Sequence, residues 1–328
     1  MVDFRFRGND GFLFRTPHSE FRIMITAPDY IQFYPTLLCN RSCDFCFNKE
    51  MPFVPDMPLE NYRTMLVRLK SIGVKTIDII GGEPTIHKNI IAIIHEAEQN
   101  GFNVNLSSNG TNTETLSRIL ETTKKTTAGI SINDRETPGY LKMFIKKHRP
   151  VVKTVFTAGM DYRIVEEMLT LKPMKFYLLY RDAMGTNDLA GTQPFFRFLA
   201  EIHKKFDPLI VDTVYCSGFL PDTKNHPELS NVRCPAGTTK LGVAPDGSVY
   251  PCNLFFGRPE LRLGNILTDP FDAVWSNRLL DFFRTFSRNT CPQVSCSLHD
   301  TCHGGCPAHS LIHFGKFSAH EPRCSRGR

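Results

Sequence analysis

The sequence predicts an α/β protein built on a parallel sheet with helices packed outside it. Two patterns support this fold class. Short apolar segments alternate with amphipathic segments from about residue 31 to residue 215, and glycines stand where helical patterns stop. The composition, with 41% hydrophobic and 22% charged residues, is that of an ordinary globular chain. Its 328 residues suffice for one large or two modest domains.

Six strands are expected, with helices between them. The first, residues 31–38, ends at a cysteine-rich loop, although Pro35 within it is typical of an edge position. Two helical patterns of apolar residues stop at Gly73 and Gly101, as helices commonly do. The other expected strands are residues 76–80, 102–106, 128–132, 151–156 and 175–180. In parallel α/β folds the functional groups gather at the C-terminal ends of such strands.

The most specific motif follows the first strand. Cys39, Cys43 and Cys46 have C-x3-C-x2-C spacing, with an aromatic residue just before the last cysteine. Three thiolates can hold three irons of a 4Fe–4S cube and leave the fourth iron open for a small molecule, whereas closed clusters use four. A zinc knuckle and a disulfide loop are the alternatives. Zinc sites favour paired C-x2-C units, however, and no further Cys or His follows until His87.

This run of cysteines resembles the cluster motif of the radical S-adenosylmethionine (SAM) superfamily. The resemblance implies a partial (β/α)6 TIM-like barrel whose first strand is an edge. It implies an open iron that chelates the amino and carboxylate groups of SAM. It also implies one-electron cleavage of SAM to methionine and a 5′-deoxyadenosyl radical, which abstracts a substrate hydrogen atom. Phe45 is then expected beside the adenine.

Motifs at the next three strand ends are similar to the SAM-binding motifs of this family. The loop Gly81-Gly82-Glu83-Pro84 follows the second strand, and its glycines allow close backbone approach to a ligand. The resemblance implies hydrogen bonds from its backbone and the Glu83 carboxylate to the SAM amino group. It places Ser107 and Asn109 against the ribose and carboxylate, with a plain turn at Asn109 as the alternative. Ser131 and Asn133 are also assigned to SAM, although many relatives have Ser-x-Asp there.

Seven of the eleven cysteines lie in the last hundred residues. Their pattern resembles the SPASM domain, a small cysteine-rich domain that holds two auxiliary 4Fe–4S clusters, with zinc ribbons as the alternative. The chain departs from the family pattern by having C-x4-C between Cys291 and Cys296. By matching order, auxiliary cluster I takes Cys234, Cys252 and Cys306, and auxiliary cluster II takes Cys291, Cys296, Cys302 and Cys324.

Two further residues qualify this assignment. Auxiliary cluster I has three obvious thiols, and Cys216 is the spare one. Cys216 is a fourth ligand, a hydrogen-atom donor to a substrate radical, or an inert buried cysteine. Asn253 stands where sulfatase maturases have an aspartate thought to act as base, which argues against a sulfatase-maturing role.

Three segments are expected along the chain. Residues 1–30 form short strands around Gly8 and Gly11, which leaves no room for the leader-binding domain that peptide-modifying relatives often carry. Residues 31–215 form the barrel, and residues 216–328 form the SPASM domain.

The expected function is oxidative modification of a ribosomally made peptide by crosslinking or dehydrogenation, with three 4Fe–4S clusters and SAM as cofactors. The alternatives are oxidation of a small metabolite such as an aminoglycoside alcohol, and peptide epimerisation with Cys216 as hydrogen donor. A non-catalytic iron–sulfur carrier is a further alternative, but a carrier needs no SAM site. Candidate substrate-facing groups at strand ends are Thr157, Tyr180, Arg181 and Asp182, with Asp212 near the expected domain boundary.

Composition also bears on location and partners. The first residues contain no apolar signal core, and no apolar run approaches membrane-span length, which predicts a reducing, cytoplasmic protein without a membrane partner. The net charge of +6 comes without runs of Lys and Arg interleaved with aromatics, so no nucleic-acid partner is expected. The expected partners are a peptide or small-molecule substrate and a flavodoxin- or ferredoxin-type reductant.

Overall fold

The computed structural model describes most of the chain. The described ranges are residues 27–134, 136–157, 159–185, 192–206, 211–214, 234–284, 291–297 and 299–324. The strands expected around Gly8 and Gly11 and the spare cysteine Cys216 lie outside these ranges.

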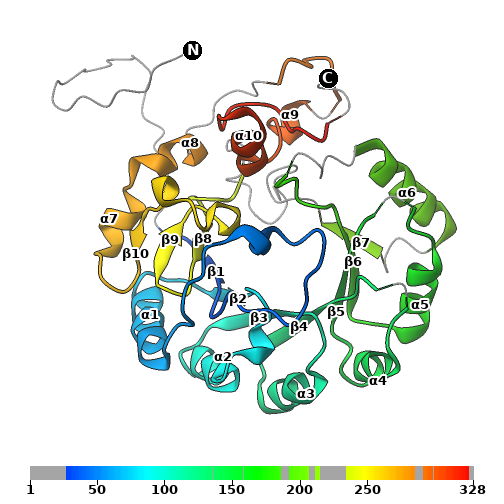
Figure 1. The fold of residues 1–328 in the computed structure, drawn as a ribbon, viewed down its shortest axis with the longest axis horizontal. Helices are drawn as coiled ribbons and strands as arrows, with labels where there is room; N and C mark the ends of the chain where they lie inside the picture. The colour runs from blue at the N-terminus through cyan, green and yellow to red at the C-terminus, as the bar shows by residue number, and fades with distance from the viewer. Residues whose placement is uncertain are drawn as a thin grey trace.

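A single mixed sheet forms the centre of the described part of the chain (Figure 1). Its spatial order is β10-β9-β8-β1-β2-β3-β4-β5-β6-β7. All neighbours from β8 through β7 are parallel, and β8, β9 and β10 pair antiparallel, which confirms the α/β class with a parallel-dominated sheet. The strands are β1 (Tyr30–Phe33), β2 (Thr76–Ile79), β3 (Asn103–Ser108), β4 (Thr126–Ser131), β5 (Val151–Val155), β6 (Lys175–Leu179), β7 (Val211–Val214), β8 (Lys240–Val243), β9 (Ser248–Tyr250) and β10 (Gly264–Asn265).

Helices α1 to α6 ring the outside of the curved sheet, and the C-terminal helices lie across its open side (Figure 1). Strand residues alternate between the two faces, and Phe33 of β1 stacks on Tyr62 of α1 with ring centroids 5.3 Å apart. The longer helices are α1 (Leu59–Ser71), α2 (Ile90–Gln99), α3 (Thr113–Thr122), α4 (Gly139–His148), α5 (Arg163–Leu171), α6 (Thr192–Lys205) and α10 (Pro307–Phe314). Shorter helical turns are η1 (Phe47–Glu50), η2 (Pro84–Ile86), η5 (Asn253–Phe255), η6 (Pro259–Leu261), α7 (Phe271–Trp275), η7 (Arg278–Leu280), α8 (Asp281–Arg284) and α9 (His299–Cys302).

The first strand differs from its prediction in two ways. It ends at Phe33 rather than at residue 38, and Pro35, which has no N–H to donate to a ladder, lies just beyond it. The expectation that β1 is an edge was wrong, because β1 pairs with β2 on one side and with β8 on the other. The open side of the barrel therefore carries additional strands from the C-terminal segment.

The structure also contains a parallel strand, β7, that the sequence analysis did not predict. The domain limits at residues 30 and 215 stay predictions. No helix in the described ranges is both long and apolar enough to cross a membrane.

Candidate functional site

The cysteine loop, residues 39–46, leaves the C-terminal side of β1 and is fastened to the ends of neighbouring strands. Asn109, after β3, donates from Nδ2 to Oδ1 of Asn40 at 2.8 Å. Arg41 forms a 2.8 Å ion pair with Asp134, which follows β4. The loop is thereby held at the end of the barrel where α/β enzymes carry their active sites.

The three thiols of this loop are free and close to one another. Cys39 is exposed, and Cys43 and Cys46 are half-buried. Burial raises the pKa of Cys43, and the neighbouring Cys46 and Cys39 raise it further. Three thiolates that repel one another suit a cationic iron cluster, so the chemistry of the donor set fits the expected group.

A single-ion site is not formed in the described ranges, where no group of three or more His, Cys, Asp and Glu side chains could hold one metal ion. A cubane distributes its thiolates over several irons and does not require one shared centre. The assignment of Cys39, Cys43 and Cys46 to the SAM cluster stays a prediction, as does the place of Phe45 beside adenine.

The glycines after β2 pack against the chain that leads into the cysteine loop. A Cβ on Gly82 would lie 1.9 Å from the main-chain oxygen of Leu38, and one on Gly81 would lie 2.5 Å from that of Thr36. Main-chain N–H groups of Gly82 and Glu83 donate to Thr36 at 3.1 Å and to Leu38 at 2.8 Å. The close approach seen here is between two segments of backbone.

Glu83 is 1% exposed and joins the loops after β2 and β3. Its Oε1 accepts hydrogen bonds from the main-chain N–H of Thr85 at 3.0 Å, the Thr85 hydroxyl at 2.6 Å and the Ser108 hydroxyl at 2.8 Å. Its Oε2 accepts from the main-chain N–H of Asn109 at 2.7 Å. The expected contacts of Gly81, Gly82, Glu83 and Pro84 with SAM stay predictions, and the observed role of Glu83 is to fix two loops together.

The other expected SAM contacts also have partners within the protein. Asn109 forms the turn that was the alternative interpretation, because its Oδ1 accepts from the main-chain N–H of Thr111 at 3.0 Å. Ser107 accepts from the Lys153 ammonium at 2.8 Å. Asn133 accepts the main-chain N–H of Val155 at 2.8 Å. Ser131 lies opposite Lys153 in the β4–β5 register. Their contacts with SAM stay predictions.

Two charged residues of the strands were missed by the sequence analysis. Asp78 of β2 is 8% exposed, and burial raises the pKa of its carboxyl while the charge of Lys153 opposes the shift. A Cβ on Gly129 would lie 2.8 Å from Cε of Lys153, so this glycine makes room for the lysine. A single charge within each of the strand sequences T-I-D-I and V-V-K-T-V was the available signal.

The C-terminal cysteines fall into two environments. Cys234, Cys252 and Cys306, expected in auxiliary cluster I, are buried. Burial raises the pKa of Cys302 to about 11, and the charges of Cys324 and Cys291 contribute to the shift. Three of the four cysteines expected in auxiliary cluster II are therefore neighbours. The ligand sets, including Cys296, stay predictions.

The candidate substrate-facing residues are separated by the structure. Tyr180 is buried; it stacks on Phe195 with ring centroids 4.8 Å apart, and the Arg323 guanidinium lies 4.2 Å from its ring centroid. Thr157 is exposed after β5. Arg181 donates to the main-chain oxygen of Asp44 in the cysteine loop at 3.3 Å. Asp182 lies beside His309 of α10, with Oδ1 3.1 Å from Nε2, and the side chain of Asp212 lies outside the described part of the structure.

Comparison with known proteins identifies two domains. Residues 33–156 match the radical SAM superfamily, and residues 234–307 match an iron–sulfur cluster-binding domain, SPASM. Both occur in the predicted order, and together they indicate SAM binding and iron–sulfur clusters. Cys324 lies beyond the second match.

Similar proteins align along most of the chain. A tungsten-containing aldehyde ferredoxin oxidoreductase cofactor-modifying protein of Pyrococcus furiosus is 22% identical, over 83% of this chain and 88% of that protein. The mycofactocin maturase MftC of Mycobacterium ulcerans is 23% identical, over 94% of this chain and 91% of its own length.

A solved structure supports the fold. Streptococcus suis SuiB bound to S-adenosylmethionine has a TM-score of 0.71 at 20% identity, covering 92% of this chain and 78% of that chain. This likeness confirms the partial-barrel fold. The two domain matches, in this order, show that the chain belongs to the radical SAM superfamily as an enzyme with a C-terminal SPASM domain.

Proposed function

We propose that this enzyme oxidatively modifies a ribosomally made peptide, by forming a crosslink or by dehydrogenation. The observation that carries the proposal is the match with a mycofactocin maturase over 94% of this chain and 91% of the relative. SuiB, whose fold this chain shares, has also been solved bound to its precursor peptide SuiA, with a TM-score of 0.71.

The cofactors of this proposal are three 4Fe–4S clusters and SAM. Cys39, Cys43 and Cys46 hold the cluster that supplies the electron for SAM cleavage when it is bound. The protein positions this group through the Asn40–Asn109 hydrogen bond and the Arg41–Asp134 ion pair, which anchor the cysteine loop to the ends of β3 and β4. The buried Glu83 fixes the two loops expected around SAM against each other.

The cluster assignment is tested by iron and sulfide analysis after anaerobic reconstitution. The wild type is expected to hold about 12 irons per chain, and a variant with Cys39, Cys43 and Cys46 changed to Ala about 8. About 4 irons in the wild type, with zinc making up the remainder, would instead rule out the auxiliary clusters.

If a short reading frame lies beside the gene, the substrate is tested with the peptide that it encodes. The enzyme is incubated with this peptide, SAM and dithionite, and then with a flavodoxin or ferredoxin as the proposed natural reductant. Crosslinking and dehydrogenation each remove two hydrogen atoms from the peptide, which mass spectrometry detects. An unchanged mass with deuterium uptake from solvent would indicate epimerisation instead.

Oxidation of a small molecule is the second candidate. The similarity to a protein named for cofactor modification favours it, because that alignment also covers most of both chains. This candidate predicts that the neighbouring peptide returns unmodified and does not stimulate 5′-deoxyadenosine formation. A small metabolite would stimulate its formation instead.

A further inference from the structure

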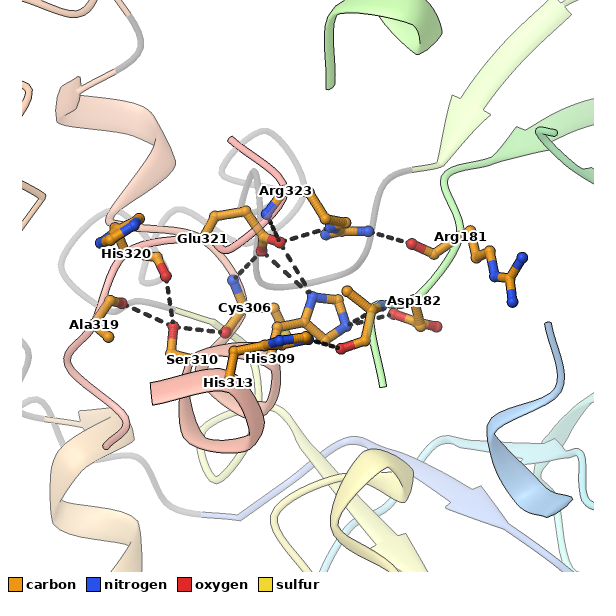
Figure 2. Close-up of polar contacts among 11 residues, drawn as sticks. Arg181, Asp182, Cys306, His309, Ser310, His313, Ala319, His320, Glu321 and Arg323 are labelled. Carbon is orange, nitrogen blue, oxygen red and sulfur yellow. Dashed lines mark hydrogen bonds and ion pairs between the residues drawn. The ribbon is translucent and has the colours of Figure 1, made fainter. Parts of the chain in front are cut away.

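A buried chain of polar contacts joins the end of β6 to the C-terminal segment (Figure 2). Oδ1 of Asp182 lies 3.1 Å from Nε2 of His309, on α10. Nδ1 of His309 lies 3.4 Å from each carboxylate oxygen of Glu321. The side chains of His309 and Glu321 are 0% and 1% exposed, whereas that of Asp182 is 28% exposed. Of the three residues, Asp182 is therefore the one that solvent or a substrate can reach.

Glu321 is fixed at the inner end of this chain. Its Oε1 accepts from Nε of Arg323 at 2.6 Å, and its Oε2 accepts from the main-chain N–H of Cys306 at 3.1 Å. Gly305 has φ +82°, and a Cβ there would lie 2.4 Å from Cβ of Glu321. A residue with a side chain at position 305 would displace the carboxylate, so the backbone here is shaped around Glu321.

The geometry sets where protons reside. Nδ1 of His309 faces a carboxylate on Glu321 and therefore donates to it. Nε2 lies 3.1 Å from Oδ1 of Asp182, and when it carries no proton it accepts the main-chain N–H of Ala183 at 3.3 Å. A hydrogen bond between Asp182 and Nε2 requires one shared proton. When that proton is on the imidazole, Nε2 no longer accepts from Ala183, and Asp182 is a carboxylate paired with an imidazolium.

A base is required by the proposed reaction. Removing two hydrogens from a substrate breaks two bonds to hydrogen. One hydrogen atom leaves with the adenosyl group of SAM, one electron leaves to an iron–sulfur cluster of the SPASM domain, and one proton needs an acceptor. Asn253 cannot take that proton at neutral pH, and its Nδ2 donates to the Tyr34 hydroxyl at 3.1 Å.

We propose that Asp182 is the catalytic base that accepts the substrate proton, and that His309 and Glu321 are positioning residues that hold it ionised. This assignment rests on the proposed oxidative function. Asp182 follows β6 on the same end of the barrel as the cysteine loop, which its neighbour Arg181 contacts at Asp44. The acceptor thus lies between the SAM motifs and the segment that carries the auxiliary cysteines.

The test compares Asp182→Asn with wild type in the peptide assay described above. The readout is the amount of oxidised peptide formed per 5′-deoxyadenosine. Hydrogen-atom abstraction needs no base, whereas completion of the oxidation does. We expect this ratio to fall at least tenfold in Asp182→Asn, since general-base catalysis contributes about 10²- to 10⁴-fold. Asp161→Asn is the matched control, because Asp161 is an exposed carboxylate after β5 that pairs with Arg163. Its ratio should equal that of wild type.

The positioning role is tested by pH. The groups around Asp182 are His309 and His313 on α10, Glu321 and Arg323 on the C-terminal segment, and Arg181 beside it. In wild type the product ratio should rise with pH as Asp182 loses its proton. Loss of the imidazolium raises the pKa of a neighbouring carboxyl, so His309→Gln and Glu321→Gln should move the midpoint to higher pH. A purely structural role would lower iron content or yield without moving that midpoint.

The outcomes separate the two proposals. If wild type forms 5′-deoxyadenosine but converts no peptide, the oxidative peptide function fails and the base assignment fails with it. If wild type converts the peptide and Asp182→Asn gives the same ratio with full iron content, only the base assignment is overturned. A depressed ratio in Asp182→Asn, together with shifted midpoints in the two positioning variants, supports it.

Discussion

At the scale of single residues, the loop after β2 makes contacts within the protein that hold neighbouring loops in place. Gly82 allows its backbone to lie against Leu38, the residue immediately before Cys39. The Glu83 carboxylate accepts four hydrogen bonds, from Thr85, Ser108 and Asn109. The cysteine loop and the loops after β2 and β3 are consequently one packed unit, so a displacement of one loop should displace the others.

We therefore expect Gly82→Ala to lose the SAM cluster while the rest of the protein folds. The new Cβ would lie 1.9 Å from a backbone oxygen that cannot rotate away, so the entry to the cysteine loop must shift. Iron content should fall from about 12 to about 8 per chain, and 5′-deoxyadenosine formation should disappear.

Gly139→Ala is the control for this prediction. A Cβ at Gly139 meets nothing within 4 Å and needs no unusual φ. Its iron content and SAM cleavage should match wild type. Full iron content in Gly82→Ala would show that the loop tolerates the displacement.

At the scale of elements, the sequence predicts strands better than it predicts contacts. Five of the six expected strands lie within two residues of their observed ends, because buried apolar runs bounded by glycines have a clear pattern. Strand β7 was missed, although with four residues it is as long as the predicted strand β2. Contacts such as Lys153 with Ser107, or His309 with Asp182 across 127 residues, depend on the curvature of the sheet and are not encoded in spacing.

The turn η2 after the glycine loop gives a pH-dependent prediction. His87 is 2% exposed, and burial is the main cause that lowers its pKa, so it is held neutral in the folded protein. The unfolded chain binds this proton near pH 6.5. Stability should therefore be fully present above that pH and decline as pH falls below it, since the unfolded state then binds more protons.

His87→Asn should reduce this decline. Nδ1 of His87 accepts the main-chain N–H of Asn89 at 3.2 Å, and Oδ1 of asparagine can replace that acceptor without titrating. We expect the unfolding midpoint of wild type to drop more than that of the variant between pH 7 and pH 5.5, under anaerobic conditions. Parallel curves for the two proteins would contradict the assignment.

At the scale of the whole molecule, the two matched domains share one sheet. Strand β8, from the SPASM match, lies parallel to β1 with Phe33 opposite Val243. Arg68 of α1 donates to the main-chain oxygen of Asp269 at 2.8 Å. Leu241 and Val243 are buried in the same hydrophobic core as the barrel residues. The cysteine loop follows the strand that joins both parts, so cluster binding and domain pairing are coupled through β1.

This coupling predicts that the barrel segment, without the SPASM domain, is poorly soluble. A chain truncated after residue 233 loses β8, leaves one side of β1 unpaired and uncovers apolar residues that are buried in the intact protein. We expect its soluble yield to fall roughly tenfold or more, consistent with the tendency of unpaired, apolar edges to aggregate. A variant with Cys291, Cys296 and Cys302 changed to Ala is the control, because it removes auxiliary-cluster ligands and keeps β8. That variant should stay soluble and still bind iron at the cysteine loop. A truncated chain that is soluble and holds about 4 irons would instead show that β1 and its loop are stable without their SPASM partner.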